Sequence, residues 1–196
     1  MSSDGARGET RIEEPTPAER AVARRAAESR ATVPSFELSV SVDGVSTTAQ
    51  LVNACAQALA GHPRANGAYR DGRFELYSRV NIGIVVAVAD AYLIPTVFAA
   101  DRRTADELAP EIAQLEADAL AGTLTAPAFG AATFTVWNAA ALGLAGASIP
   151  VVPPQAAALA AGTRQLTLCC DHRILYGARA AAFLETIAHH LDRGRV

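Results

Sequence analysis

The most informative stretch of this sequence is LTLCCDHRILYG, residues 166–177. An apolar run typical of a buried strand ends at Asp171, and His172 follows directly before a turn and a helix. Tyr176 comes four residues after that histidine. Because the chain has only four histidines, one at the end of a core strand is a candidate functional residue.

On both sides of this stretch, strand patterns alternate with helix patterns. Apolar residues at helical spacing predict helices over residues 17–30, 46–59, 104–120 and 178–193. Strands are predicted over residues 36–42, 74–89 (two strands), 92–97, 133–138, 156–160 and 164–170. Several strands follow one another without a helix between them. We therefore expect an α/β (α+β) fold, with a mixed β-sheet packed with helices, and not a doubly wound parallel sheet.

Composition limits the classes of function. With 196 residues, 51% of them apolar, residues 17–196 are expected to form a single domain behind a disordered segment, residues 1–16. The net charge of −3 and the absence of long charge runs argue against nucleic-acid binding. The first thirty residues are polar, and no apolar segment reaches the ~18–20 residues of a membrane span, so we expect a cytoplasmic protein without membrane contact.

Two other residue types give no sign of a site. The cysteines, Cys55, Cys169 and Cys170, lack disulfide or zinc spacing, so reduced thiols and no metal are expected. Every basic residue is an arginine. In a sequence so rich in alanine this suggests coding bias, and we do not interpret the arginines as phosphate ligands.

Seven segments together resemble one family, the catalytic domain of the 2-oxo acid dehydrogenase acyltransferases (the dihydrolipoamide acyltransferase, or E2, core). Its fold is that of chloramphenicol acetyltransferase. In the family's order the segments are RAVARRAAESRATVPSF, HPRANGAY, VNIGIVVAV, LIPTV, TFTVWN, PPQAA and CDHRILYG, and they span about residues 19–193. The resemblance implies acyl transfer with acetyl-CoA as the donor substrate and no bound cofactor. It also implies a homotrimer whose active sites lie between neighbouring subunits.

The family's catalytic histidine maps onto His172. A neutral imidazole suits the chemistry, because a hydroxyl or thiol must lose its proton as it attacks a thioester. In the resemblance, Asp171, Arg173 and Gly177 are the structural part of the same motif.

Two residues depart from the family's pattern inside the expected site. Tyr176 stands where the family has an aspartate that pairs with an arginine, and its phenol offers only a hydroxyl. Trp137 stands where the family's Thr-x-Ser-Asn run has the serine that stabilises the oxyanion. Thr135, on the same strand face as Trp137, could supply a hydroxyl instead. Tyr176, Thr135 and Asn138 are therefore the candidate oxyanion or acceptor contacts, and Trp137 is a candidate pocket wall or plain core packing.

Further departures concern whole segments. Neither a lipoyl domain nor a subunit-binding domain precedes the resembling region, and the helix that the family places after FELSVSVD is missing. Only LAAGTRQ remains of the hairpin before DHR, and the chain ends at HHLDRGRV without the family's hydrophobic tail. We therefore expect a trimer and not a large hollow core.

These departures favour one function among three. The hypothesis is a stand-alone O-acetyltransferase that acts on a hydroxyl of a small molecule, similar to the E2-like enzymes of tetronate natural-product pathways. Aromatic walls at Trp137 and Tyr176 suit a flat ring better than a lipoyl arm. The alternatives are a lipoamide acyltransferase core of a 2-oxo acid dehydrogenase complex and a catalytically inactive E2-like scaffold.

Overall fold

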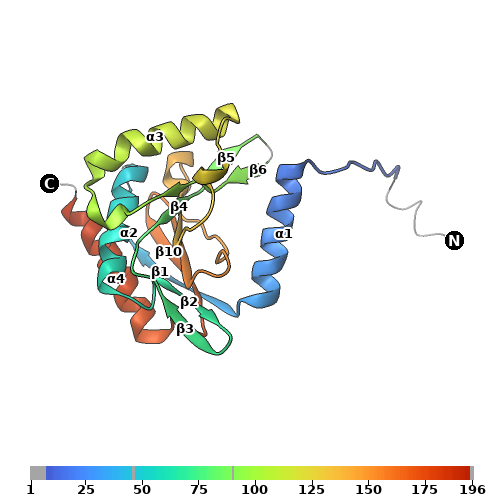
Figure 1. Ribbon diagram of the computed structural model, residues 1–196. Helices are drawn as coiled ribbons and strands as arrows, with labels where there is room; N and C mark the ends of the chain where they lie inside the picture. The colour runs from blue at the N-terminus through green and yellow to red at the C-terminus, as the bar shows by residue number, and fades with distance from the viewer. Residues whose placement is uncertain (1–7, 46, 90, 195–196) are drawn as a thin grey trace.

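The computed structural model describes residues 8–45, 47–89 and 91–194. A six-stranded sheet with the strand order β1-β10-β9-β8-β4-β7 forms its centre (Figure 1). The strands are β1 (Ser35–Ser41), β10 (Gln165–Asp171), β9 (Ala157–Ala161), β8 (Phe134–Asn138), β4 (Ile82–Ile84) and β7 (Thr96–Val97). Strand β8 is parallel to β4 and to β9, and the other pairs are antiparallel. The predicted mixed sheet is confirmed.

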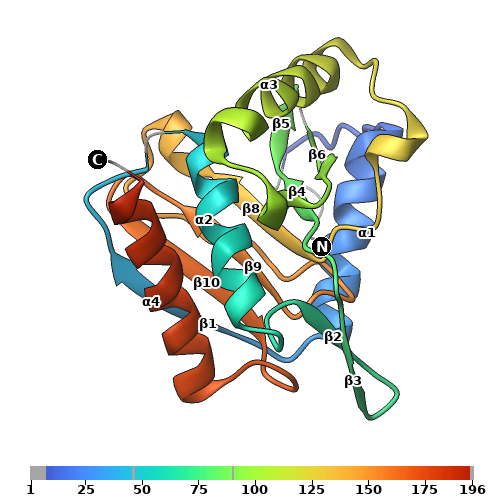
Figure 2. The same cartoon turned by 60° about the vertical axis from the view of Figure 1, so that its left-hand side comes forward.

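Three helices cover one face of this sheet. Helix α2 (Thr48–Gly61) lies between α3 (Ala105–Ala121) and α4 (Gly177–Arg193) (Figure 2). Alternate residues of β10, such as Leu166 and Leu168, are fully buried against them, together with Phe183 and Ile187 of α4. Since successive strand residues point to opposite faces, Thr167, Cys169 and Asp171 lie on the other face.

The remaining elements surround this core, and two of them contact its helices: η2 (Ala100–Arg102) touches α2 and β5 (Val86–Val88) touches α3. Helix α1 (Pro17–Thr32) contacts β6 (Ala91–Leu93), which forms a hairpin with β5. A second hairpin joins β2 (Gly67–Arg70) and β3 (Arg73–Leu76). Short 3₁₀ turns complete the fold at η2, η3 (Ala126–Ala128) and η4 (Ala139–Leu142).

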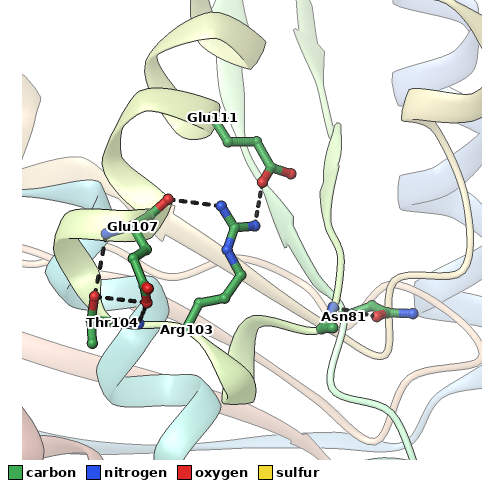
Figure 3. A network of polar contacts seen from close by, with 6 residues as sticks. Asn81, Arg103, Thr104, Glu107 and Glu111 are labelled. Atoms are coloured by element: carbon green, nitrogen blue, oxygen red, sulfur yellow. Dashed lines mark hydrogen bonds and ion pairs between the residues drawn. The ribbon is translucent and has the colours of Figure 1, made fainter.

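The helices begin where the sequence places capping residues. The Thr104 hydroxyl accepts the Glu107 backbone N–H at 3.3 Å, and the Glu107 carboxylate accepts the Thr104 backbone N–H at 2.8 Å, a complete capping box. Arg103 then pairs with Glu111 one turn further along α3 (Figure 3). The Asn81 amide donates to the Ala131 carbonyl at 3.0 Å and accepts the Ala99 N–H, which fixes the loops around β4.

All four predicted helices are present within two residues of their expected ends, although the expected start of α2 at Ser46 lies outside the described residues. The strand predictions need three corrections. Residues 74–89 form three strands and not two, and Pro95, which has no backbone N–H to donate, separates β6 from β7 in the run predicted as one strand. Strand β2 was not predicted, because it is short and lacks an alternating pattern. Residues 8–16 form no helix or strand, and residues 1–7 of the segment expected to be disordered lie outside the described residues.

Candidate active site at the end of strand β10

The turn that follows β10 is held by Asp171. Its carboxylate is only 1% exposed and accepts two side-chain hydrogen bonds from Arg173, Nε to Oδ1 at 2.9 Å and Nη2 to Oδ2 at 2.7 Å. It also accepts the Arg173 backbone N–H at 3.0 Å, and the Leu175 N–H donates to the Asp171 carbonyl. A bidentate charged pair of this kind is geometrically specific. The residue between the two partners is therefore presented from a fixed turn.

That residue is His172. Its backbone N–H donates to the Pro34 carbonyl at 2.9 Å, which ties the turn to the start of β1. The imidazole packs edge-on against Phe36, with ring centres 4.9 Å apart, and lies 5.8 Å from the ring of Tyr176. His172 lies beyond the last residue of the buried strand and is exposed in the single chain. The ring is thus oriented but accessible.

Tyr176 and Gly177 form the entry into helix α4. Tyr176 is the N-cap residue, makes no side-chain capping bond and is 47% exposed beside His172. Gly177 has φ +52°, a left-handed conformation that strains any residue with a side chain. The left-handed backbone at position 177 therefore explains why the motif has glycine there. The exposed Tyr176 side chain can contact a ligand or a neighbouring subunit.

Trp137 does not meet His172 within one chain. In the sheet register Trp137 is opposite Ala160, which is opposite Thr167, so His172 lies five residues further along β10. At about 3.4 Å per residue this places the two side chains ~17 Å apart along the strands, and two strands apart across the sheet. The expectation that both aromatic replacements surround His172 holds for Tyr176 alone.

Trp137 instead lines an apolar cavity of about 240 Å³. The cavity lies between β8, the β5–β6 hairpin and the loop before β9. Its lining is Val85, Ala87, Ala91, Tyr92, Ile94, Thr135, Trp137, Ile149, Pro150 and Val152. The walls are almost entirely apolar and include two aromatic rings, a combination that suits a small ring-shaped ligand.

The other two candidate contacts are placed differently from the expectation. Thr135 is fully buried, and its hydroxyl donates to the Gln155 side-chain oxygen at 2.8 Å, so that proton is already used. Asn138 points to the helix face of the sheet, because it is adjacent to Trp137 on the strand. There its amide donates to the Thr48 hydroxyl at 3.3 Å, and it borders a separate, more polar cavity of about 610 Å³.

The thiols are poor candidates for the reacting group. Burial raises the pKa of the Cys55 thiol, and burial together with Cys169 and Asp171 raises the pKa of the Cys170 thiol. Both therefore stay protonated at neutral pH. In the part of the chain that the structure describes, no three His, Cys, Asp or Glu side chains gather as a metal site. Over the same residues, no helix has both the length and the apolar character needed to cross a membrane.

The site thus consists of an oriented, accessible histidine at the end of one strand of a mixed sheet, and comparison with known proteins identifies the family. Residues 42–194 match the 2-oxoacid dehydrogenases acyltransferase (catalytic domain) family. The chain belongs to this family, and the predicted resemblance is confirmed.

Individual relatives agree with this assignment. The dihydrolipoyllysine-residue acetyltransferase component of the pyruvate dehydrogenase complex of Mycoplasma capricolum is 30% identical over 162 residues, 73% of this chain and 37% of that protein. The chain thus spans about a third of the length of the curated relatives it matches. A solved structure of the cubic core of the pyruvate dehydrogenase multienzyme complex is 26% identical, with a TM-score of 0.88 over 100% of this chain and 97% of that chain.

Two more distant structures share the fold. The dihydrolipoamide acetyltransferase of Azotobacter vinelandii has a TM-score of 0.90 at 24% identity, covering 100% of this chain and 96% of that chain. A chloramphenicol acetyltransferase has a TM-score of 0.59 at 15% identity, covering 86% and 95%. The predicted chloramphenicol acetyltransferase-like fold is confirmed.

Sequence reasoning missed two residues near the cavity. Tyr92, in the run predicted as one strand, lines the cavity beside Trp137. Arg25 of α1 lies against the Tyr92 ring, with the guanidinium carbon 5.8 Å from the ring centre. In the sequence Arg25 is one of many arginines on an alanine-rich helix, and no local signal separates it from the others.

Proposed function

We propose that this chain transfers an acetyl group between coenzyme A and a dihydrolipoyl thiol, with His172 as the general base. The observation that carries the proposal is the placement of His172, oriented by Pro34, Phe36 and the Asp171–Arg173 pair and still accessible. The names of the relatives support this acceptor, since they are dihydrolipoyllysine-residue acetyltransferase components of pyruvate dehydrogenase complexes. They support it better than the tetronate acceptor expected from the sequence.

The mechanism follows from the chemistry of the ring. The neutral imidazole of His172 takes the proton of the attacking thiol as its sulfur bonds to the thioester carbonyl carbon. The carbonyl oxygen becomes an oxyanion, which needs a hydrogen-bond donor. When the intermediate collapses, the bond to the sulfur of coenzyme A breaks, and the imidazolium returns the proton to that sulfur. The acetyl group has moved from coenzyme A to the attacking thiol, and the His172 imidazole is neutral again.

The active site lies between subunits in this proposal. His172 and the Trp137 cavity are at opposite ends of the sheet, on surfaces that a second copy can bring together. A closed ring of three copies joined head to tail would make three such sites, each with His172 from one subunit and the cavity from its neighbour. The indole N–H of Trp137 is then a candidate oxyanion donor from the cavity.

A second acceptor, a hydroxyl on a small ring, is favoured by the cavity itself. Its walls are apolar and include the rings of Trp137 and Tyr92, and its volume of about 240 Å³ suits a small ring. In the Azotobacter vinelandii enzyme, catalytic roles were investigated for a serine, a histidine and an asparagine four residues beyond that histidine. This chain has Tyr176 four residues after His172, a departure that supports a different acceptor.

Acetyl transfer with two acceptors tests the proposal. Purified protein is incubated with acetyl-CoA and either dihydrolipoamide or a hydroxymethyl-bearing tetronate, and free coenzyme A is measured. Release with dihydrolipoamide alone supports the first acceptor, and release with the tetronate alone supports the second. Release with neither, from folded protein, would contradict both and favour the inactive scaffold.

Replacing Trp137 with serine separates the two acceptors further. We expect the KM for a ring-shaped acceptor to rise about 10- to 70-fold, because ~60–100 Å² of apolar contact at about 25 cal/mol per Å² is lost. The KM for acetyl-CoA should stay unchanged. Steady-state kinetics with both substrates varied give the answer. A higher rate with dihydrolipoamide and an unchanged KM for the ring would instead assign Trp137 to plain packing.

Replacing Tyr176 with phenylalanine removes one hydroxyl from a residue next to His172. If that hydroxyl contacts the acceptor or the oxyanion, the rate should fall about 2- to 12-fold, the worth of one neutral hydrogen bond of ~0.5–1.5 kcal/mol. Tyr77→Phe, at a half-buried tyrosine in another region, is the matched control. Equal rates for the parent and both variants would remove Tyr176 from the list of contacts.

A further inference from the structure

The guanidinium of Arg25, a half-buried residue of α1, has one buried nitrogen and no counterion among the described residues. Its Nη1 atom is buried and forms no hydrogen bond. Among the residues that the structure describes, no carboxylate forms an ion pair with it, whereas Arg103 and Arg173, for example, do have acidic partners. A buried donor of a charged group with no partner is unfavourable, because its N–H bonds lose water and gain no acceptor.

The contact that Arg25 does make leaves its donors free. Its guanidinium carbon lies over the Tyr92 ring, a cation–π contact that gives the Nη1 donors no hydrogen-bond acceptor. Tyr92 is also a wall of the Trp137 cavity, so an arginine with unused donors lies directly beside an apolar pocket. Arg25 is not itself part of the lining, so a ligand must reach past the tyrosine ring to meet it.

We propose that Arg25 binds an anionic group carried by the acceptor whose ring occupies the Trp137 cavity, such as a carboxylate or an acidic enolate. The proposal rests on the second proposed acceptor, a hydroxyl on a small ring, and adds that this acceptor molecule carries an acidic group. The small apolar cavity takes a ring and excludes phosphates, so the charge lies outside it, where the planar fork of arginine pairs well with two oxygens. The phosphates of coenzyme A carry the same chemistry, and the experiment distinguishes them.

The test is a binding titration that needs no acetyl transfer. Trp137 is the only tryptophan of the chain, so its fluorescence reports occupancy of the cavity. The probes are tetronic acid, an anion at neutral pH, its uncharged O-methyl ether, and acetyl-CoA. The proteins are the parent chain, Arg25→Gln and Arg24→Gln, a matched control at an exposed arginine of the same helix.

We expect the parent to prefer the acid over the ether, and Arg25→Gln to weaken the acid alone about 10- to 100-fold, the worth of a charged hydrogen bond. Arg24→Gln should change nothing. Equal affinity of the parent protein for acid and ether would overturn the proposal without relying on any variant. Weaker acetyl-CoA binding in Arg25→Gln would assign the anion to coenzyme A. A changed oligomer with unchanged acid affinity would assign it to a neighbouring copy. Either result also overturns the proposal.

Discussion

Replacing His172 with alanine is expected to lower the rate of acetyl transfer about 10²- to 10⁴-fold, the usual contribution of a general base. The fold should be unaffected. The ring is exposed, and the bond that ties this turn to Pro34 comes from the backbone N–H, which alanine keeps. The measurement is the initial rate of coenzyme A release, with a thermal melt of the same sample.

The matched control is His189→Ala, at an exposed histidine of helix α4. It should leave both the rate and the melting temperature at the parental values. If His172→Ala transferred acetyl within about tenfold of the parent at an unchanged melting temperature, His172 would not be the base.

The second large effect is expected at the other half of the site. Trp137→Asp places a carboxylate in an apolar cavity and removes the indole N–H. A negative charge there disfavours the developing oxyanion and costs free energy to bury. We expect a loss of about 10²- to 10³-fold in rate, comparable to losing an oxyanion donor.

Trp137→Phe separates the effect of the charge from the loss of the indole N–H, because it also lacks that N–H but keeps an aromatic wall and adds no charge. Circular dichroism and a thermal melt of both variants show whether the fold as a whole is retained. A half-buried position near the end of a strand should tolerate either residue. Equal activity of Trp137→Asp and the parent chain would place the reaction away from this cavity.

The part of the site that lies within one short stretch could be predicted from the sequence. Asp171, His172 and Arg173 are consecutive, so the strand that ends at Asp171 also fixes the turn. The hydrogen bonds between the Asp171 carboxylate and the Arg173 guanidinium join residues only two positions apart. The helices could be predicted for the same reason, since capping residues such as Thr104 act over one turn. Sequence patterns therefore predict those features whose contacts join residues within a few positions of one another.

The relation between His172 and Trp137 could not be predicted in this way. It depends on the register of β10, β9 and β8, which pairs residues far apart in the sequence. Exposure of His172 likewise depends on where β10 ends relative to Pro34. Arg25 is harder still, because its significance comes from contact with Tyr92 on a different element. Long-range packing, and not the pattern of either segment, sets these distances.

A subunit-mixing experiment tests whether the active site is built from His172 of one subunit and the Trp137 cavity of the next. His172→Ala and Trp137→Asp chains are mixed, dissociated and reassembled, with the size checked by light scattering. Each variant alone should be almost inactive as a trimer. Random mixing should restore about a quarter of the parental activity, since about a quarter of the sites then combine two intact halves. Mixed trimers no more active than either variant, or full activity in a parental monomer, would contradict the shared site.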